Sequence, residues 1–316
     1  MMARFLLYTL HSTLNTHHSP PYFCQLMKTL LIANPIAGKG RALAAALQVQ
    51  AHNPQALIEL YQTKAAGDAT QRTALAVAEG YECVVAVGGD GTVNEVAQAL
   101  VHTEVALGIV PVGSGNGLAR HLGYPMQPVQ AFAHILQAQP RRIDYGLVNG
   151  KPFFTTFGVG FDGLVAQAFA ERRGSRGLMR YVALALSLYR RYVPFEAQFL
   201  YEDEQLAEKH IFSIVFGNAN QFGNNFYICP DASLTDGLLD MTLIKRQSIL
   251  NTLQLMLKIL QRHSFKELAT ERKIIQSTIL CSSKIPYHLD GEFAGMEQAF
   301  EVKAVPDGLV VKARIS

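Results

Sequence analysis

The segment at residues 84–96 (VVAVGGDGTVNEV) constrains the fold more than any other part of the chain. An apolar, β-branched run ends in the glycine turn 88–92, and apolar residues then recur at helical spacing. The pattern predicts a buried strand, a tight turn and a helix start. Because the three glycines lack Cβ atoms, backbone N–H groups can approach phosphate oxygens. A glycine-rich turn without a ligand is the alternative.

Asp90 is the only charged residue in this turn. A carboxylate repels bare phosphate, so we expect Asp90 to hold a hydrated Mg²⁺ ion that bridges to a nucleotide.

The composition indicates an ordered protein of two domains. The chain has 316 residues, of which 49% are hydrophobic and 17% charged, and this excludes a disordered protein. The net charge of +3 does not indicate a nucleic acid partner. The four cysteines have no metal-ligand spacing, so we expect reduced thiols and a cytoplasmic location.

Residues 1–27 stand apart from the rest of the chain. Their one apolar run, at 5–10, is too short to span a bilayer, and no convincing cleavage site follows it. We expect a disordered tail or a start site placed too far upstream.

Strands and helices are predicted to alternate up to about residue 146. Strands are expected at 29–33, 56–61, 84–87 and 107–111, with helices at 41–50, 68–79, 118–122 and 128–139. A second glycine turn, VGSGNG at 112–117, follows the fourth strand. Parallel strands would bring both turns to one sheet edge, where ligands of α/β sheets bind. The first domain is therefore predicted at 28–146, as a three-layer α/β domain with a parallel sheet.

The pattern changes after residue 146 to alternating strands with Gly and Asn turns. It predicts a β-rich, sandwich-like domain with a few helices at 147–304. Two strands are expected to close the chain, at 299–305 and 309–315. The segment 305–316 forms a terminal strand, and its return to the first domain is left open.

Three glycine motifs and a late acidic motif resemble one family. NPIAGKG, GGDGTVNEV, PVGSGNGLAR and DGE occur in the order seen in the catalytic domain shared by diacylglycerol kinases, sphingosine kinases and soluble bacterial lipid kinases. GGDGT alone is also similar to NAD kinases and phosphofructokinases, and the flanking motifs favour the lipid kinases. The resemblance implies ATP and Mg²⁺ in a cleft between the domains. It also implies phosphorylation of a diacylglycerol- or sphingoid-type hydroxyl in lipid metabolism and phospholipid biosynthesis.

The resemblance also implies which residues bind the nucleotide. They lie in the turns that follow the predicted strands. They are Asn34, Thr63, Gly88, Gly89, Asp90, Gly91, Thr92 and Ser114. Gly117 departs from the pattern of many bacterial members, which have aspartate there, and is closer to the sphingosine kinases, which have a small residue at this position. The identity of the lipid stays open.

Glu292 is the expected general base, and Asp90 is the other expected catalytic residue. In the DGE motif the glutamate is taken to accept the proton of the lipid hydroxyl. Asp290 is expected as its neighbour or as a metal contact. An ordinary Asp-Gly hairpin turn is the alternative reading of this motif.

A structural Mg²⁺ site is implied in the loop at 231–240. By resemblance, its ligands are the Asp236 carboxylate and the main-chain carbonyls of Ser233 and Leu238. Few protein ligands and several waters suit this ion.

Two further aspartates resemble family positions. Asp144 belongs to a charged network near the cleft or to the surface. Asp162 contacts a lipid amine or caps the helix that follows.

The segment 172–191 combines arginines with an apolar run that is too short to span a bilayer. A core helix is favoured over a membrane contact. The expected partner is a lipid substrate, met by transient contact at the inner membrane face, and a homodimer is left open. A kinase of a soluble alcohol such as NAD, and an ATP-binding relic without catalysis, are the alternative functions.

Overall fold

A computed structural model describes residues 27–171, 178–201 and 204–314. Apart from residue 27, the tail expected at 1–27 lies outside this range. The first domain contains β1 (Thr29–Ala33), α1 (Ala42–His52), β2 (Ile58–Gln62), α2 (Asp68–Ala78), β3 (Cys83–Gly88), α3 (Asp90–Leu100), β4 (Ala106–Pro111), α4 (Gly117–His121) and α5 (Pro128–Gln137).

The strands of the first domain lie in the order β2-β1-β3-β4, and each neighbouring pair runs parallel. The chain moves from β1 to β2 in one direction along the sheet and from β2 through β3 to β4 in the other, so right-handed crossovers place α1 on one face and both α2 and α3 on the opposite face. Accordingly, α1 contacts α5, and α2 contacts α3. The β-branched and leucine side chains of β1, β3 and β4 fill the core between these layers. Their burial on both faces explains the continuous apolar runs in the sequence.

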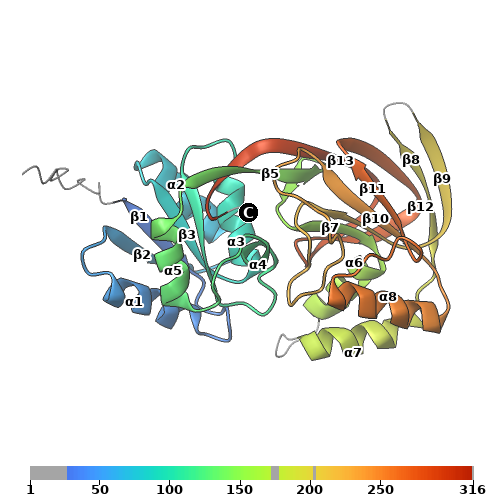
Figure 1. The fold of residues 1–316 in the computed structure, drawn as a ribbon, viewed down its shortest axis with the longest axis horizontal. Helices are drawn as coiled ribbons and strands as arrows, with labels where there is room; N and C mark the ends of the chain where they lie inside the picture. The colour runs from blue at the N-terminus through green and yellow to red at the C-terminus, as the bar shows by residue number, and fades with distance from the viewer. Residues whose placement is uncertain (1–26, 172–177, 202–203, 315–316) are drawn as a thin grey trace, which may run out of the picture.

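The second domain is β-rich, and its described residues include the helices α6, α7 and α8 (Figure 1). Its elements are β5 (Pro140–Val148), β6 (Lys151–Phe153), β7 (Thr156–Gly160), α6 (Phe161–Glu171), α7 (Leu178–Tyr189), β8 (Phe195–Leu200), β9 (Gln205–Gly217), β10 (Leu239–Lys245), α8 (Ile249–Gln261), β11 (Thr270–Ile274), β12 (Gln276–Leu289) and β13 (Glu292–Lys312). The pairs among β7 to β12 are antiparallel. Phenylalanines of β7, β9 and β13 pack together in its core.

One long strand connects the two domains. β13 pairs antiparallel with β12 and β5, and its end pairs parallel with β4 through Val311 and Leu107. The whole sheet is therefore mixed. The separate strands expected at 299–305 and 309–315 are one strand, whose pairing with β5 shifts register between Val305 and Leu309. β5 was not predicted as a strand, and it runs through the boundary expected near residue 146.

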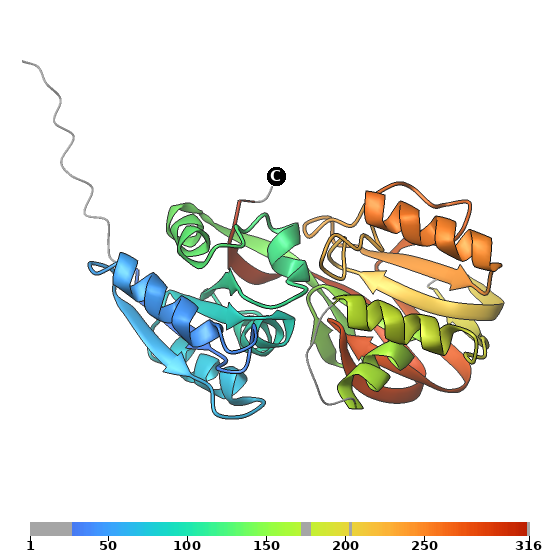
Figure 2. The same cartoon turned by 90° about the horizontal axis from the view of Figure 1, so that it is seen from below.

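α7 and α8 lie on the same outer face of the second domain (Figures 1 and 2). A hydrogen bond of 2.8 Å joins Tyr189 Oη and Thr252 Oγ1 across them. Ser248 caps α8, since its Oγ accepts a hydrogen bond from the Asn251 N–H at 3.2 Å. Within the described residues, none of the helices has the length and apolar character needed to span a membrane.

Candidate active site

Three glycine loops meet at the carboxyl edge of the first domain's sheet. A Cβ atom at Gly113 would lie 2.5 Å from Gly89 Cα, and one at Gly38 would lie 2.4 Å from Val112 O. Neither position has space for a side chain. The glycines therefore let the loops after β1, β3 and β4 pack backbone against backbone, as expected for loops that share one edge.

Asp90 joins two of these loops. Its Oδ2 accepts a hydrogen bond from the Asn116 N–H at 2.8 Å, and its Oδ1 accepts one from the Gly117 N–H at 2.7 Å. Surrounding protein desolvates the carboxylate and raises its pKa to about 6, although the two N–H donors act in the opposite direction and the residue keeps intermediate exposure. The first role of Asp90 is thus to hold the β4–α4 turn against the β3–α3 turn.

The structure explains why glycine occupies position 117. A Cβ atom there would lie 2.9 Å from Thr155 Cγ2 and 3.0 Å from Gln221 O, both in the second domain. Asn116 before it adopts a left-handed conformation with φ 56°, which asparagine tolerates. The aspartate common in bacterial members would not fit here without movement of the second domain.

The other expected nucleotide-binding residues follow the strands of the same sheet. Asn34 follows β1, Thr63 follows β2, and Ser114 lies exposed in the turn after β4. Parallel pairing places Ala33 beside both Gln62 and Val87, so these positions lie along one edge. The Asn34 Oδ1 accepts a hydrogen bond from the Ile36 N–H at 3.2 Å, which stabilises the first loop.

Glu292 reaches this edge from the second domain. Its Oε1 lies 3.7 Å from the position of a Cβ atom on Gly91, in the first turn of α3. The carboxylate is exposed to solvent. The acid expected to act as base thus lies beside the glycine turn expected to bind phosphate.

Asp290 has a structural role that the motif did not reveal. Its carboxylate accepts hydrogen bonds from the N–H groups of residues 154, 155 and 156 and from Asn94 Nδ2 of α3, at 2.7–3.2 Å. Four donors engage this carboxylate, so it fits poorly as a metal contact. Asp290 and Gly291 both have positive φ, the geometry of a two-residue hairpin turn. The alternative reading of this motif as a hairpin turn is therefore confirmed.

A buried pair supports this turn from behind. His288 Nε2 lies 3.1 Å from Asp162 Oδ2, and His288 Nδ1 accepts a hydrogen bond from the Gly291 N–H at 3.2 Å. The second bond assigns the imidazole proton to Nε2. Asp162 Oδ1 accepts a hydrogen bond from Ser213 Oγ at 2.8 Å. Asp162 is buried, and both of its carboxylate oxygens have partners inside the protein, so a contact with a lipid amine stays a prediction.

Asp144 is buried, contrary to the surface alternative. It accepts hydrogen bonds from the Gly237 N–H at 2.7 Å and the Asp307 N–H at 2.9 Å. Burial raises the pKa of this carboxyl, and the two N–H donors oppose that shift. Asp144 thus anchors the loop expected to bind metal.

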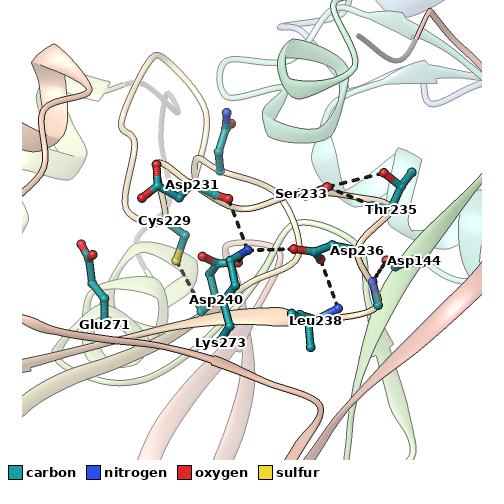
Figure 3. Close-up of polar contacts among 12 residues, drawn as sticks. Asp144, Cys229, Asp231, Ser233, Thr235, Asp236, Leu238, Asp240, Glu271 and Lys273 are labelled. Atoms are coloured by element: carbon teal, nitrogen blue, oxygen red, sulfur yellow. Dashed lines mark hydrogen bonds and ion pairs between the residues drawn. The ribbon is translucent and has the colours of Figure 1, made fainter.

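Figure 3 shows this loop, in which a lysine pairs with two aspartates. Lys273 Nζ lies 2.8 Å from Asp236 Oδ2 and 3.0 Å from Asp240 Oδ2. Asp236 Oδ1 accepts a hydrogen bond from the Leu238 N–H at 3.1 Å, and Ser233 Oγ accepts one from the Thr235 N–H. Lys273 thus neutralises the one carboxylate of the expected set Ser233, Asp236 and Leu238, so the structure gives no support to a resident Mg²⁺ there.

The described residues also contain no group of three or more His, Cys, Asp or Glu side chains that could hold a metal. We assign no step of the reaction to an ion in this loop.

Sequence reasoning missed the supporting residues Asn94, His288 and Lys273. Each looks like an ordinary polar residue of a helix or strand, because the aspartate that it contacts lies at least 33 positions away. For His288, the only nearby sequence feature that indicated a functional role was the DGE motif at 290–292.

Comparison with known proteins agrees with this arrangement. The diacylglycerol kinase catalytic domain model matches residues 28–148, and the YegS C-terminal NAD kinase beta sandwich-like domain model matches residues 155–313. A diacylglycerol kinase of Mycobacterium tuberculosis is 33% identical over 299 residues, which cover 91% of this chain and 95% of that protein. The chain belongs to the diacylglycerol kinase catalytic-domain family.

More distant members of this family are similar over most of their length. A diacylglycerol kinase of Bacillus subtilis is 28% identical over 278 residues, covering 86% of this chain and 91% of that protein. The crystal structure of a diacylglycerol kinase from Bacillus anthracis has a TM-score of 0.70 at 19% identity, covering 92% of this chain and 98% of that chain. At that identity the likeness concerns the fold. Family membership indicates a kinase, and the names of the relatives indicate a lipid kinase.

Proposed function

We propose that the protein transfers the γ-phosphate of ATP to the hydroxyl group of a diacylglycerol- or sphingoid-type lipid. The observation that carries this proposal is the approach of Glu292, from the second domain, to Gly91 at the start of α3 in the first. A helix start offers free N–H groups and a partial positive charge to a phosphate. A carboxylate at that distance can accept a hydrogen bond from a hydroxyl group that attacks the phosphate.

In the proposed reaction, Glu292 accepts the proton of the lipid hydroxyl. The hydroxyl oxygen forms a bond to the γ-phosphorus while the bond from that phosphorus to the β–γ bridging oxygen breaks, and ADP leaves. Positioning and charge neutralisation supply most of the catalysis in such transfers. The glycine turns supply backbone donors, and Asp90 keeps the two turns in register.

Asp90 would hold the Mg²⁺ that accompanies ATP, and the ion would supply neutralisation of charge on the phosphates. Each Asp90 oxygen accepts one backbone N–H and retains a lone pair. One carboxylate together with waters and phosphate oxygens is a donor set that suits this ion.

Phosphorylation of a soluble alcohol such as NAD is the competing function. Because the second domain matches an NAD kinase beta sandwich-like model, NAD is included among the substrates to be tested. The order of the three glycine motifs and the names of the relatives favour a lipid.

Radiolabelled ATP offered with diacylglycerol, sphingosine, ceramide or NAD separates these functions. Label in the organic phase, lost in Glu292→Gln, supports the proposal and identifies the lipid. Label on NAD assigns the soluble kinase instead. ATP binding without any labelled product would leave an ATP-binding relic.

A further inference from the structure

An apolar stripe runs along the outer side of α8. Leu250, Leu253 and Leu257 are 78%, 51% and 58% exposed, and Ile249 and Leu260 are exposed beside them. Their spacing of three and four residues places them on one side of the helix. A separate side of the same helix is buried in the domain through Leu255 and Ile259. The core therefore does not account for the exposed leucines.

The neighbouring helix extends this surface. Leu186 of α7 and Val193 just after it are also exposed, and the bond between Tyr189 and Thr252 holds the two helices together. Figure 2 shows both helices on the side of the second domain that faces the viewer. We call this surface the α7–α8 face. It consists of Leu186, Val193, Ile249, Leu250, Leu253, Leu257 and Leu260.

The segments that form this face have an unusual charge. Residues 178–194 and 245–266 contain eight of the chain's 28 Lys and Arg residues and none of its 25 Asp and Glu residues. The rest of the chain is net acidic. Positive charge is thus concentrated in these two segments of the sequence, although the net charge of the whole chain is small.

Arginines at the helix ends supply the charge that this face can offer to a partner. Arg190 and Arg191 follow α7, Arg262 follows α8, and all three are exposed. The lysines of the α8 segment pair with acids outside it, as Lys258 does with Glu267.

We propose that the α7–α8 face docks on the surface of an anionic lipid bilayer. The leucines enter the boundary between headgroups and acyl chains, and the arginines contact the lipid phosphates. The partner follows from the charge. In a symmetric dimer the same face would meet itself, which brings together two faces that both carry exposed arginines and would repel each other. The docking proposal rests on the proposed function, because a kinase needs to bind a bilayer only when its substrate is a lipid.

Contacts inside the protein connect this face to the active site. The Tyr227 N–H donates to the Ile259 carbonyl of α8 at 3.2 Å. The loop before Tyr227 packs on the second glycine turn, where a Cβ at Gly223 would lie 2.7 Å from Gly115 Cα. Phe222 of this loop also contacts the His288 ring, with 5.6 Å between the ring centroids. Docking would thus hold the cleft close to the bilayer.

Vesicle sedimentation with the full-length protein tests the proposal. Wild-type protein should bind vesicles of phosphatidylcholine with phosphatidylglycerol, and bind phosphatidylcholine alone much more weakly. The combined variant Leu250→Ser, Leu253→Ser and Leu257→Ser should lose binding on the order of 100-fold. The variant Leu47→Ser, Leu57→Ser and Leu75→Ser is a matched control, because these leucines of the first domain are 52%, 53% and 57% exposed. It should bind as wild type.

Kinase assays with detergent-dispersed lipid separate docking from catalysis. There the α8 variant should keep wild-type turnover, and it should lose activity only on lipid in vesicles. Leucine-dependent vesicle binding by a protein without kinase activity would retain the docking proposal and overturn the proposed function. Unchanged vesicle binding by the α8 variant, or a wild-type dimer that this variant dissociates, would overturn docking on lipid.

Discussion

His288 Nε2 lies 3.1 Å from Asp162 Oδ2, in the interior directly behind the turn that carries Glu292. The other nitrogen of the same ring accepts the Gly291 N–H. A chain of hydrogen bonds thus runs from Ser213 through Asp162 and His288 to the residue before the expected base. Gly158 makes space for it, since a Cβ there would lie 2.0 Å from Asp162 Oδ2.

This relationship makes His288 a positioning residue for Glu292. His288→Ala should lower kcat on the order of 10-fold, because the turn at 290–291 that carries Glu292 loses a hydrogen bond. The KM for ATP should stay unchanged, because the glycine turns of the first domain keep all their contacts. The loss of a buried hydrogen-bonded partner should also cost about 1–3 kcal/mol of stability. His288→Asn retains an acceptor near Gly291 and should recover part of kcat. A stability loss with wild-type kcat would assign His288 a purely structural role.

Glu292→Gln removes the expected base and keeps the size of the side chain. Turnover should fall about 10²–10⁴-fold, the usual range for loss of a general base. ATP affinity, measured by calorimetry, should stay within about twofold, because the nucleotide turns are untouched. Glu297→Gln is the control, since Glu297 is an exposed glutamate of the same strand. A Glu292→Gln enzyme with normal turnover would remove this residue from the mechanism.

Local patterns predicted much of the first domain. The alternation of apolar runs, glycine turns and helical periodicity at 29–111 depends on neighbours in the chain, so β1, β3 and β4 were located within one residue. The glycine motifs also predicted where the loops lie close together, because the contact between the backbones of Gly89 and Gly113 leaves no space for a side chain.

Contacts between distant residues were not predictable in the same way. Asp162 and His288 lie 126 positions apart, and each alone looks like a helix cap or a strand residue. Asp290 was recognised as important, but nothing in its motif shows that Asn94 and three backbone N–H groups occupy its carboxylate. β13 was expected as separate strands because the Pro-Asp-Gly signal at 306–308 is typical of a turn, whereas the strand continues past it with a shift in register.

The raised pKa of Asp90 predicts how activity depends on pH. Its charge is lost as pH falls through about 6, rather than near 4 as for an ordinary aspartate. If the charged form is required, kcat/KM should fall below pH 6, and Asp90→Asn should have low activity without this acidic limb. The folded state binds this proton more tightly than the unfolded chain does, so protonation of Asp90 does not itself destabilise the fold. Thermal melts in EDTA at pH 5 and pH 7 would show whether unfolding causes the loss instead.

Gly117→Asp restores the residue that is common in bacterial members, and we expect it to be harmful here. The new Cβ would press on Thr155 Cγ2 and the Gln221 carbonyl, so the domains would have to separate slightly. Overpacking of this kind costs about 1–3 kcal/mol, measurable by urea denaturation. Gly91→Ala is the comparison, because its Cβ would meet its nearest neighbour at an ordinary 3.7 Å. If Gly117→Asp is as stable as Gly91→Ala, then the second domain moves at Thr155 and Gln221 to make space for the new side chain at little cost in stability.

Lys273 predicts that the loop at 231–240 needs no metal. Burial alone would lower the pKa of Lys273, but the hydrogen bonds to Asp236 and Asp240 outweigh burial and raise this pKa. The charged lysine therefore stabilises the fold at all pH values below its raised pKa, and this stabilisation is lost as the pH rises through that value. Lys273→Met should leave both carboxylates without their cation and lower Tm by about 2–4 °C. Mg²⁺ without nucleotide should then raise the Tm of this variant and leave wild type unchanged, because the vacated position between two carboxylates suits a divalent cation. Lys245→Met is the matched control, since Lys245 pairs with a single acid, Glu208, at 2.7 Å. A larger rise of Tm with Mg²⁺ in wild type than in Lys273→Met would instead support the ion site at Ser233, Asp236 and Leu238.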